Sequence, residues 1–422
     1  MYTAGYSTNT IRFLLLLIFS LTTLFSCSKD STSTLKNGRW HATLIREDGN
    51  NIPFTFRVES KQGQQYIAIE NAKENLRVDA LRQVGDSLFI TMPLFDSDFK
   101  LKIVNSRELE GTWTKYFKDY KEQMPFKAIQ KDRPRITTYA QPKADVSGNW
   151  DTEFPNGELN LNAIGAFDQK GNTVTGTFLT PAGDFRYLEG IVSGDTLKLS
   201  GFDGGHASLW TALIQDSLLT HGNFYSINTK PIAWQSVRSQ SDQLPDAYAG
   251  NTVKAGTVKA DFSFKDMRTN ELISISDERY KGKVVLVDFL GSWCPNCYDE
   301  TKYLIDYYNK NQQRGFEILG LDFERHAEFA PSLKAMNASF FKRFDIPYPI
   351  LHSGVSSTDR ELTEKVFPNL PQKIRAFPTL VFVDKQGYVR KIHSGFNGPA
   401  TGKYYTEFKE EFNQTVNALL SE

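Results

Sequence analysis

Cys294 and Cys297 are separated by one proline and one asparagine, and the surrounding residues predict a chemical role for the pair. Residues 284–290 are apolar except for one aspartate and are typical of a strand buried on both faces. Helical periodicity over residues 295–311 predicts a helix that begins inside the motif. Because a helix amino terminus stabilises a thiolate, a cysteine there can attack disulfides. The pattern predicts a redox-active Cys294–Cys297 disulfide that carries out thiol-disulfide exchange.

Two carboxylates are candidates for handling the protons of this reaction. Asp288 lies inside the apolar run, where loss of solvent should raise its pKa. Glu300 follows Cys297 by three residues on the predicted helix, so both acids lie where Cys297 could exchange a proton. The alternatives are a structural aspartate satisfied by water and a solvated glutamate in the first helical turn.

A Cys-x-x-Cys pair can also be half of a zinc site, which needs two more Cys or His ligands at matching spacing. The histidines in this part of the chain, His326, His352 and His393, are scattered. We therefore expect no metal and no cofactor other than the disulfide.

The elements that position the dithiol follow a mixed α/β order from residue 258 to residue 422. After the buried strand and the first helix, the pattern predicts another strand, another helix, a hairpin and a closing amphipathic helix. These elements cover residues 316–321, 328–343, 379–383 with 388–392, and 403–420.

Residues 254–422 resemble the TlpA/ResA-like branch of the thioredoxin superfamily, which consists of membrane-tethered bacterial thiol-disulfide oxidoreductases. The resemblance rests on Gly-Lys-Val-Val-Leu-Val-Asp-Phe at residues 282–289, on the dithiol motif, and on Asp299-Glu300 after it. Ala-Phe-Pro-Thr-Leu at residues 376–380 is similar to the family's cis-proline loop. The resemblance implies an α/β thioredoxin fold for this part of the chain.

The resemblance also implies roles for individual residues. Cys294 would be the exposed nucleophile and Cys297 the thiol that resolves the mixed disulfide. Pro378 would be cis, which would place the backbone of Phe377 against the dithiol to pair with substrate main chain. An ordinary proline at a strand edge is the alternative. Trp293 would shield the dithiol by packing.

The two acids and the dipeptide between the cysteines bear on mechanism and redox direction. Asp288 matches the buried acid of ordinary thioredoxins, and Glu300 matches the acid near the dithiol of ResA-like proteins. Carrying both is a departure, because many TlpA-like sequences have asparagine at the strand position. Asn296 cannot supply the cationic partner that a histidine could, so we favour a reductant over an oxidant.

The amino-terminal residues predict export and lipidation. An apolar run at residues 13–25 follows Arg12 and is too short to span a bilayer, so residues 1–26 are interpreted as a signal peptide. Leu-Phe-Ser before Cys27 resembles a lipobox, which predicts a lipidated Cys27 and a tether over residues 27–37. A secretory signal cut elsewhere is the alternative. The expected location is the bacterial cell envelope, facing the periplasm.

Residues 38–130 and 147–237 show short alternating segments, which predict an antiparallel all-β region. Three landmarks recur about 110 residues apart, which predicts two repeated meander units, each a barrel or a sandwich. We interpret Trp40 and Trp150 as core residues rather than ligand contacts. Residues 238–257 are interpreted as a linker. The landmarks are Gly-x-Trp at 38 and 148, Gly-Asp-x-Leu at 85 and 194, and Gly-x-aromatic at 111 and 222.

Composition limits the classes of partner. Lys and Arg number 49 and Asp and Glu number 49, so no basic surface for nucleic acid is expected. The expected partners are exported proteins with disulfides, a membrane electron donor and the lipid bilayer. Two alternatives stay open: a peroxiredoxin-like peroxidase, although the Pro-x-x-x-Thr-x-x-Cys pocket is absent, and a ligand- or protein-binding β-repeat lipoprotein with an appended redox domain.

Overall fold

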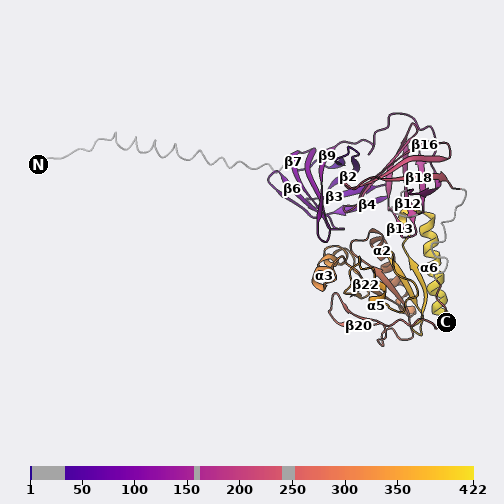
Figure 1. Cartoon of the computed structure of the whole chain (residues 1–422). Coiled ribbons are helices and arrows are strands. Elements are labelled where there is room, and N and C mark those ends of the chain that lie inside the picture. The colour runs from indigo at the N-terminus through magenta and orange to yellow at the C-terminus, as the bar shows by residue number, and fades with distance from the viewer. Residues whose placement is uncertain (2–33, 156–161, 240–251) are drawn as a thin grey trace.

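Three β-sheets organise the chain in the computed structural model, which describes Met1 and residues 34–155, 162–239 and 252–422. Two antiparallel nine-stranded sheets come first, and a seven-stranded mixed sheet with helices follows. Figure 1 shows the two β units side by side, with the α/β domain packed against them. The predicted order of an antiparallel all-β region followed by an α/β thioredoxin fold is confirmed.

The first unit is a meander in which β1 pairs with β9 and brings the two ends of the segment together. Alternation produces its core: Met124, Phe126 and Ala128 of β9 are buried, and most residues between them are exposed. The sheet order is β4-β3-β2-β1-β9-β8-β7-β6-β5. The strands are β1 (Gly38–Leu44), β2 (Ile52–Lys61), β3 (Gln64–Asn71), β4 (Glu74–Val78), β5 (Leu81–Val84), β6 (Ser87–Thr91), β7 (Ser97–Asn105), β8 (Glu108–Tyr116) and β9 (Lys121–Gln130).

The second unit repeats this plan and closes on itself. Consecutive pairings run from β10 through β11, β12, β14, β15, β16 and β17 to β18, which pairs with β10 again. This ring is a barrel. The strands are β10 (Gly148–Glu153), β11 (Ala163–Lys170), β12 (Thr173–Thr180), β13 (Gly183–Asp184), β14 (Leu188–Ser193), β15 (Thr196–Phe202), β16 (Ala207–Gln215), β17 (Leu218–Ser226) and β18 (Ile232–Arg238).

Trp40 and Trp150 occupy equivalent positions in the two units. Each is fully buried on the first strand of its unit, beside the last strand. The indole Nε1 of Trp40 donates to Lys36 O at 2.9 Å, and that of Trp150 donates to Val146 O at 2.8 Å, four residues earlier in both cases. The predicted duplication is confirmed. Their complete burial agrees with a packing role.

The two units share a core, which the sequence did not indicate. Phe202, at the end of β15, enters the first unit and stacks on Phe54 with ring centroids 4.1 Å apart. The carbonyl of Gly204 accepts hydrogen bonds from Trp113 Nε1 at 3.0 Å and from Ser97 Oγ at 2.5 Å. The β15–β16 turn therefore plugs the first unit, and an apolar space of only about 20 Å³ is left inside that unit, roughly enough for one water molecule.

The thioredoxin-fold domain has a central sheet with the order β20-β19-β23-β22-β21-β24-β25. β21 runs parallel to β22 and antiparallel to β24, and all seven of its residues are buried, as the apolar run predicts. The strands are β19 (Ser263–Asp266), β20 (Leu272–Ser274), β21 (Val284–Leu290), β22 (Phe316–Asp322), β23 (Ile350–His352), β24 (Thr379–Val383) and β25 (Val389–Ser394).

Helices cover both faces of this sheet because alternate residues of β21 enter different cores. Val284 and Leu286 pack with α2 and α6, whereas Val285 and Val287 pack with α5. The helices are α2 (Pro295–Asn311), α3 (Phe329–Ala338), α4 (Phe340–Arg343), α5 (Leu362–Val366) and α6 (Lys403–Ser421), with the short 3₁₀ turns η1 (Gln312–Arg314) and η2 (Pro399–Thr401).

One predicted helix differs from the structure. The single helix expected over residues 328–343 is divided into α3 and α4 at Ser339, whose ψ of −75° departs from regular helical geometry. Within the predicted interdomain linker, residues 238–257, residues 240–251 lie outside the described residues. Past that gap, the chain lies along β25, where Val253 N donates to Arg390 O at 3.0 Å.

Candidate active site: the Cys294–Cys297 dithiol

The dithiol lies where β21 passes into α2, as the motif predicts. Cys294 is the N-cap of α2, and Pro295 occupies the first helical position. The sulfur of Cys294 accepts a hydrogen bond from the backbone N–H of Cys297 at 3.1 Å. The two cysteines form a disulfide with their Cα atoms 5.3 Å apart. In the reduced state, the same N–H and the helix dipole can stabilise a thiolate on Cys294.

The proline loop faces this disulfide from the start of β24. The Phe377–Pro378 peptide bond is cis, as the resemblance implies, and an ordinary strand-edge proline is excluded. The sulfur of Cys294 lies 3.4 Å from Phe377 O. Trp293 packs edge-on against the ring of Phe377 with centroids 5.5 Å apart, and its Nε1 donates to Phe323 O at 2.9 Å. Trp293 is therefore packed beside the proline loop, and its shielding of the dithiol stays a prediction.

One expectation for this site is wrong. Cys294 was expected to be exposed, yet only 3% of its surface is accessible, and Cys297 is 1% exposed. Cys294 lies against Cys297 and Phe377 within its own domain, and the β units pack beside the motif, through Asp184 at Asn296 and Phe117 at Arg325. The sequence pattern of a single domain contains no sign of this packing.

Asp288 and Glu300 are both completely removed from solvent. Asp288 is 1% exposed on β21, and Glu300 is fully buried in the first turns of α2. Burial raises the pKa of Asp288 to about 7. Burial, together with the charge of Asp288, raises the pKa of Glu300 well above its usual range. The pair therefore holds at least one proton at neutral pH, and the alternative of a solvated Glu300 is excluded.

A second pair of buried acids was not anticipated. Glu324 accepts a hydrogen bond at 2.7 Å from the backbone N–H of Ser292, in the loop directly before Trp293. Asp322, at the end of β22, is also buried, and burial raises the pKa of both carboxyls well above the usual range. A sequence signal existed, because an acid ends the buried run of β22 just as Asp288 interrupts that of β21.

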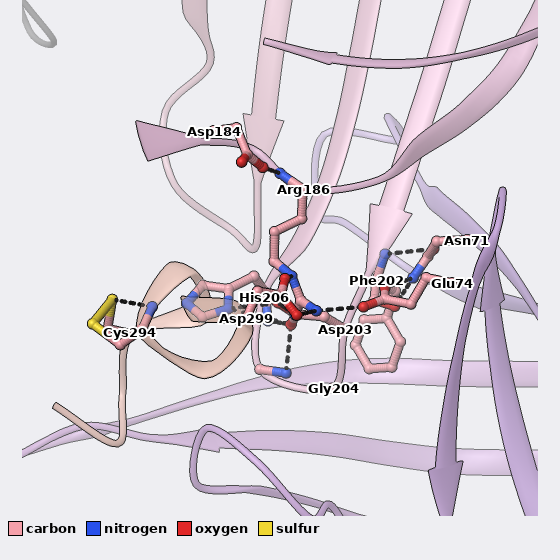
Figure 2. A network of polar contacts seen from close by, with 12 residues as sticks. Asn71, Glu74, Asp184, Arg186, Phe202, Asp203, Gly204, His206, Cys294 and Asp299 are labelled. Atoms are coloured by element: carbon pink, nitrogen blue, oxygen red, sulfur yellow. Dashed lines mark hydrogen bonds and ion pairs between the residues drawn. A yellow bond between two sulfur atoms is a disulfide. The ribbon is translucent and has the colours of Figure 1, made fainter. Parts of the chain in front are cut away.

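A buried arginine from the second β unit also reaches the site. Arg186 Nε donates to the Asp299 carboxylate at 3.0 Å, two residues past Cys297. The same guanidinium pairs with Glu74 of the first unit and with Asp203 at 3.4 Å. Figure 2 shows these carboxylates gathered around Arg186, beside Cys294. No sequence pattern connects residues from three separate segments, so this cluster could not have been predicted.

The histidines considered as zinc ligands do not gather with the cysteines. Across the residues that the structure describes, no cluster of three or more His, Cys, Asp or Glu side chains could hold a metal ion. The chemistry that this geometry supports is sulfur exchange at Cys294 and Cys297, with buried carboxyls near the same helix end.

The comparisons with known proteins agree with this geometry. A model of the AhpC/TSA family matches residues 255–392. The thiol-disulfide oxidoreductase ResA of Geobacillus thermodenitrificans is 29% identical over 167 residues, which are 40% of this chain and 79% of the relative. ResA of Bacillus cereus (strain ATCC 10987) is 32% identical over 129 residues, or 31% of this chain and 63% of the relative.

Among solved structures, a putative thiol:disulfide interchange protein DsbE from Chlorobium tepidum matches at 21% identity, covering 40% of this chain and 99% of that chain, with a TM-score of 0.30. The fold and the dithiol define a thioredoxin-fold domain of the AhpC/TSA family at the carboxy-terminal end of this chain. The chain is a thiol-disulfide oxidoreductase with relatives of the ResA type.

Proposed function

We propose that this protein is a lipid-anchored periplasmic disulfide reductase in which Cys294 attacks the substrate and Cys297 resolves the intermediate. The observation that carries the proposal is the position of Cys294 at the N-cap of α2, where its sulfur accepts the N–H of Cys297. A negative charge on this sulfur is stabilised at the helix end, whereas Cys297 lies inside the first turn.

The reaction has two sulfur-exchange steps. The Cys294 thiolate attacks one sulfur of a substrate disulfide, and the other substrate sulfur leaves as a thiolate that takes up a proton. Cys297 then loses its proton and attacks the sulfur of Cys294, which releases the second substrate thiol and leaves the Cys294–Cys297 disulfide. Two electrons and two protons from a membrane electron donor restore the dithiol. The disulfide is itself the redox group, so no other cofactor is required.

Asp288 and Glu300 are proposed to accept and return the proton of Cys297. Burial favours the neutral form of each carboxyl. When the two carboxyls share one proton, the pair carries one negative charge, and taking up the proton of Cys297 makes the pair neutral. The backbone at Phe377 and the cis Pro378 are proposed to position the substrate main chain next to Cys294, with Trp293 packed beside them.

The anchor is proposed from sequence. Cys27 and the signal peptide lie outside the described residues, and the lipobox-like Leu-Phe-Ser before Cys27 is what supports lipidation. None of the helices in the described part of the chain is long and apolar enough to cross a membrane. The proposed substrates are exported proteins that carry disulfides.

The test of these roles is a pair of matched substitutions in the exported full-length chain. Cys297→Ser should accumulate mixed disulfides with exported proteins, because the resolving thiol is missing, and Cys294→Ser should accumulate none. Trapping by the Cys294→Ser chain alone would reverse the two roles. The reduction potential of the pair, measured against glutathione, gives the direction: about −270 mV supports a reductase, and about −120 mV would indicate an oxidase.

A further inference from the structure

The turn between β12 and β13, residues 180–184, lies directly on the dithiol motif. The side-chain amide of Asn296, oriented so that both of its ends are satisfied, donates to Asp184 O at 3.3 Å and accepts from Asp184 N at 3.1 Å. Gly183 is so close to the Asn296 amide that a side chain would collide with it. Its φ of +128° also favours glycine. Asn296, one of the two residues between the cysteines, is thus bound by main chain from a β unit.

The same turn reaches the proline loop. Gly395 N donates to Pro378 O at 2.8 Å, so Gly395 adjoins the cis-proline. A Cβ on Gly395 would lie 2.8 Å from the backbone of Pro181 and Ala182. The β12–β13 turn therefore lies against Asn296 of the dithiol motif and against Gly395, the hydrogen-bond partner of the cis-proline. Figure 1 shows β12 and β13 on the side of the second unit that faces α2 and α6.

Two buried side chains hold this turn in place. The Asp184 carboxylate accepts a hydrogen bond from Gly398 N at 2.6 Å and another from Arg186 N at 2.6 Å. Arg186 in turn binds Asp299 of α2 through Nε. Hydrogen bonds between charged groups are the stronger ones in proteins, which applies to the Arg186–Asp299 pair, and all of these partners are shielded from water. The contacts join the second β unit to Gly398 and to α2, and Figure 2 shows Arg186 between Asp184 and Asp299.

The first unit covers the dithiol from another side. The guanidinium of Arg325 lies over the ring of Phe117 at 5.2 Å and over the ring of Trp293 at 5.7 Å. Glu74 of the same unit pairs with Arg186. Cys294 is only 3% exposed in this arrangement, in which both units pack beside the dithiol motif.

We propose that Asp184 and Arg186 are positioning residues that hold the β12–β13 turn over the dithiol, where it selects substrates by size. A small or extended disulfide reaches Cys294 after a small displacement of the turn, whereas a folded protein requires the β units to separate from α2. This inference rests on the proposed reductase function and adds its substrate class. It also assigns a role to the β region, which acts as the specificity element of the enzyme.

The test compares two maleimides of the same chemistry and different size on the reduced full-length protein. N-ethylmaleimide and a polyethylene-glycol maleimide of several kilodaltons should react with Cys294 at very different rates in the unmodified chain. In Arg186→Gln and in Asp184→Ala, the reaction rate with the large reagent divided by the rate with the small reagent should rise about tenfold. This ratio corresponds to a loss of about 1.4 kcal/mol in the free energy that holds the turn over the dithiol. Lys302→Gln is the matched control, because Lys302 also binds Asp299, at 3.0 Å, but belongs to α2 rather than to a β unit.

Three results would overturn the proposed size selection. Equal rates for both reagents in the unmodified chain would overturn the proposal without any variant, and so would an unchanged ratio in the variants that fold. A rise in Lys302→Gln equal to that in Arg186→Gln would also overturn it, since the effect would then come from Asp299 alone. Reduction of a small disulfide by the unmodified chain is measured separately, so failure of the reductase function is distinguishable from failure of the size selection.

Discussion

Asp288 lies at the centre of β21, and replacing it with asparagine should stabilise the thioredoxin-fold domain in a pH-dependent way. Burial raises the pKa of this carboxyl from 3.8 to about 7. Between pH 3.8 and about pH 7, Asp288 loses its proton in the unfolded chain and keeps it in the folded chain. The contribution of Asp288 to the free energy of unfolding is therefore fully present below about pH 4 and is lost as the pH rises toward 7.

The size of the effect follows from the pKa difference. At 1.36 kcal/mol per pKa unit, the loss amounts to about 4 kcal/mol above pH 7, which is an upper value because the neighbouring Glu300 shares the proton. Asparagine does not ionise, so Asp288→Asn escapes this loss. The stability gained by the substitution should thus be small near pH 4, increase with pH, and reach its plateau near pH 8.

Hydrogen exchange of the peptide that covers residues 284–290 measures this free energy, corrected for the intrinsic exchange rate at each pH. Glu317→Gln is a control with the opposite sign. Although burial alone would raise the pKa of Glu317, hydrogen bonding to Lys283 and the charge of Arg279 lower it. Glu317→Gln should therefore destabilise the domain at neutral pH. If Asp288→Asn gives the same change at pH 4 and pH 8, or destabilises at both, the assignment of a raised pKa to burial is refuted.

Further substitutions test other parts of the molecule. Glu300→Gln should slow disulfide reduction and shift its pH profile, because burial and Asp288 raise the pKa of Glu300; an unchanged profile of initial rates argues against proton transfer. Phe202→Ala should lower the free energy of unfolding by about 3–5 kcal/mol in urea titrations, whereas Leu213→Ala, at an exposed position, should change it by under about 0.5 kcal/mol. Cys27→Ser should move the protein from membranes to the soluble periplasm; persistent membrane binding would point to another anchor.

Much of the fold could be predicted because its signals are local. The period-two alternation of β9 and the continuous apolar run of β21 each indicate a strand and its environment within ten residues. The duplication was visible because Gly-x-Trp and Gly-Asp turns recur at one spacing. The start of α2 at Pro295 followed from the helical periodicity of residues 295–311 directly after the buried strand.

The sequence by itself determined the dithiol, its helix, the proline loop and the two β units, since each depends on residues close together in the chain. Only the tertiary structure decided that Cys294 is covered and that Phe202 plugs the first unit. It also joined Arg186 to Asp299 across 113 residues of chain. Such contacts leave no periodic pattern, because they depend on how finished domains pack rather than on local backbone preference. Physically, the dithiol's chemistry is encoded locally, and access to it is encoded in the packing between domains.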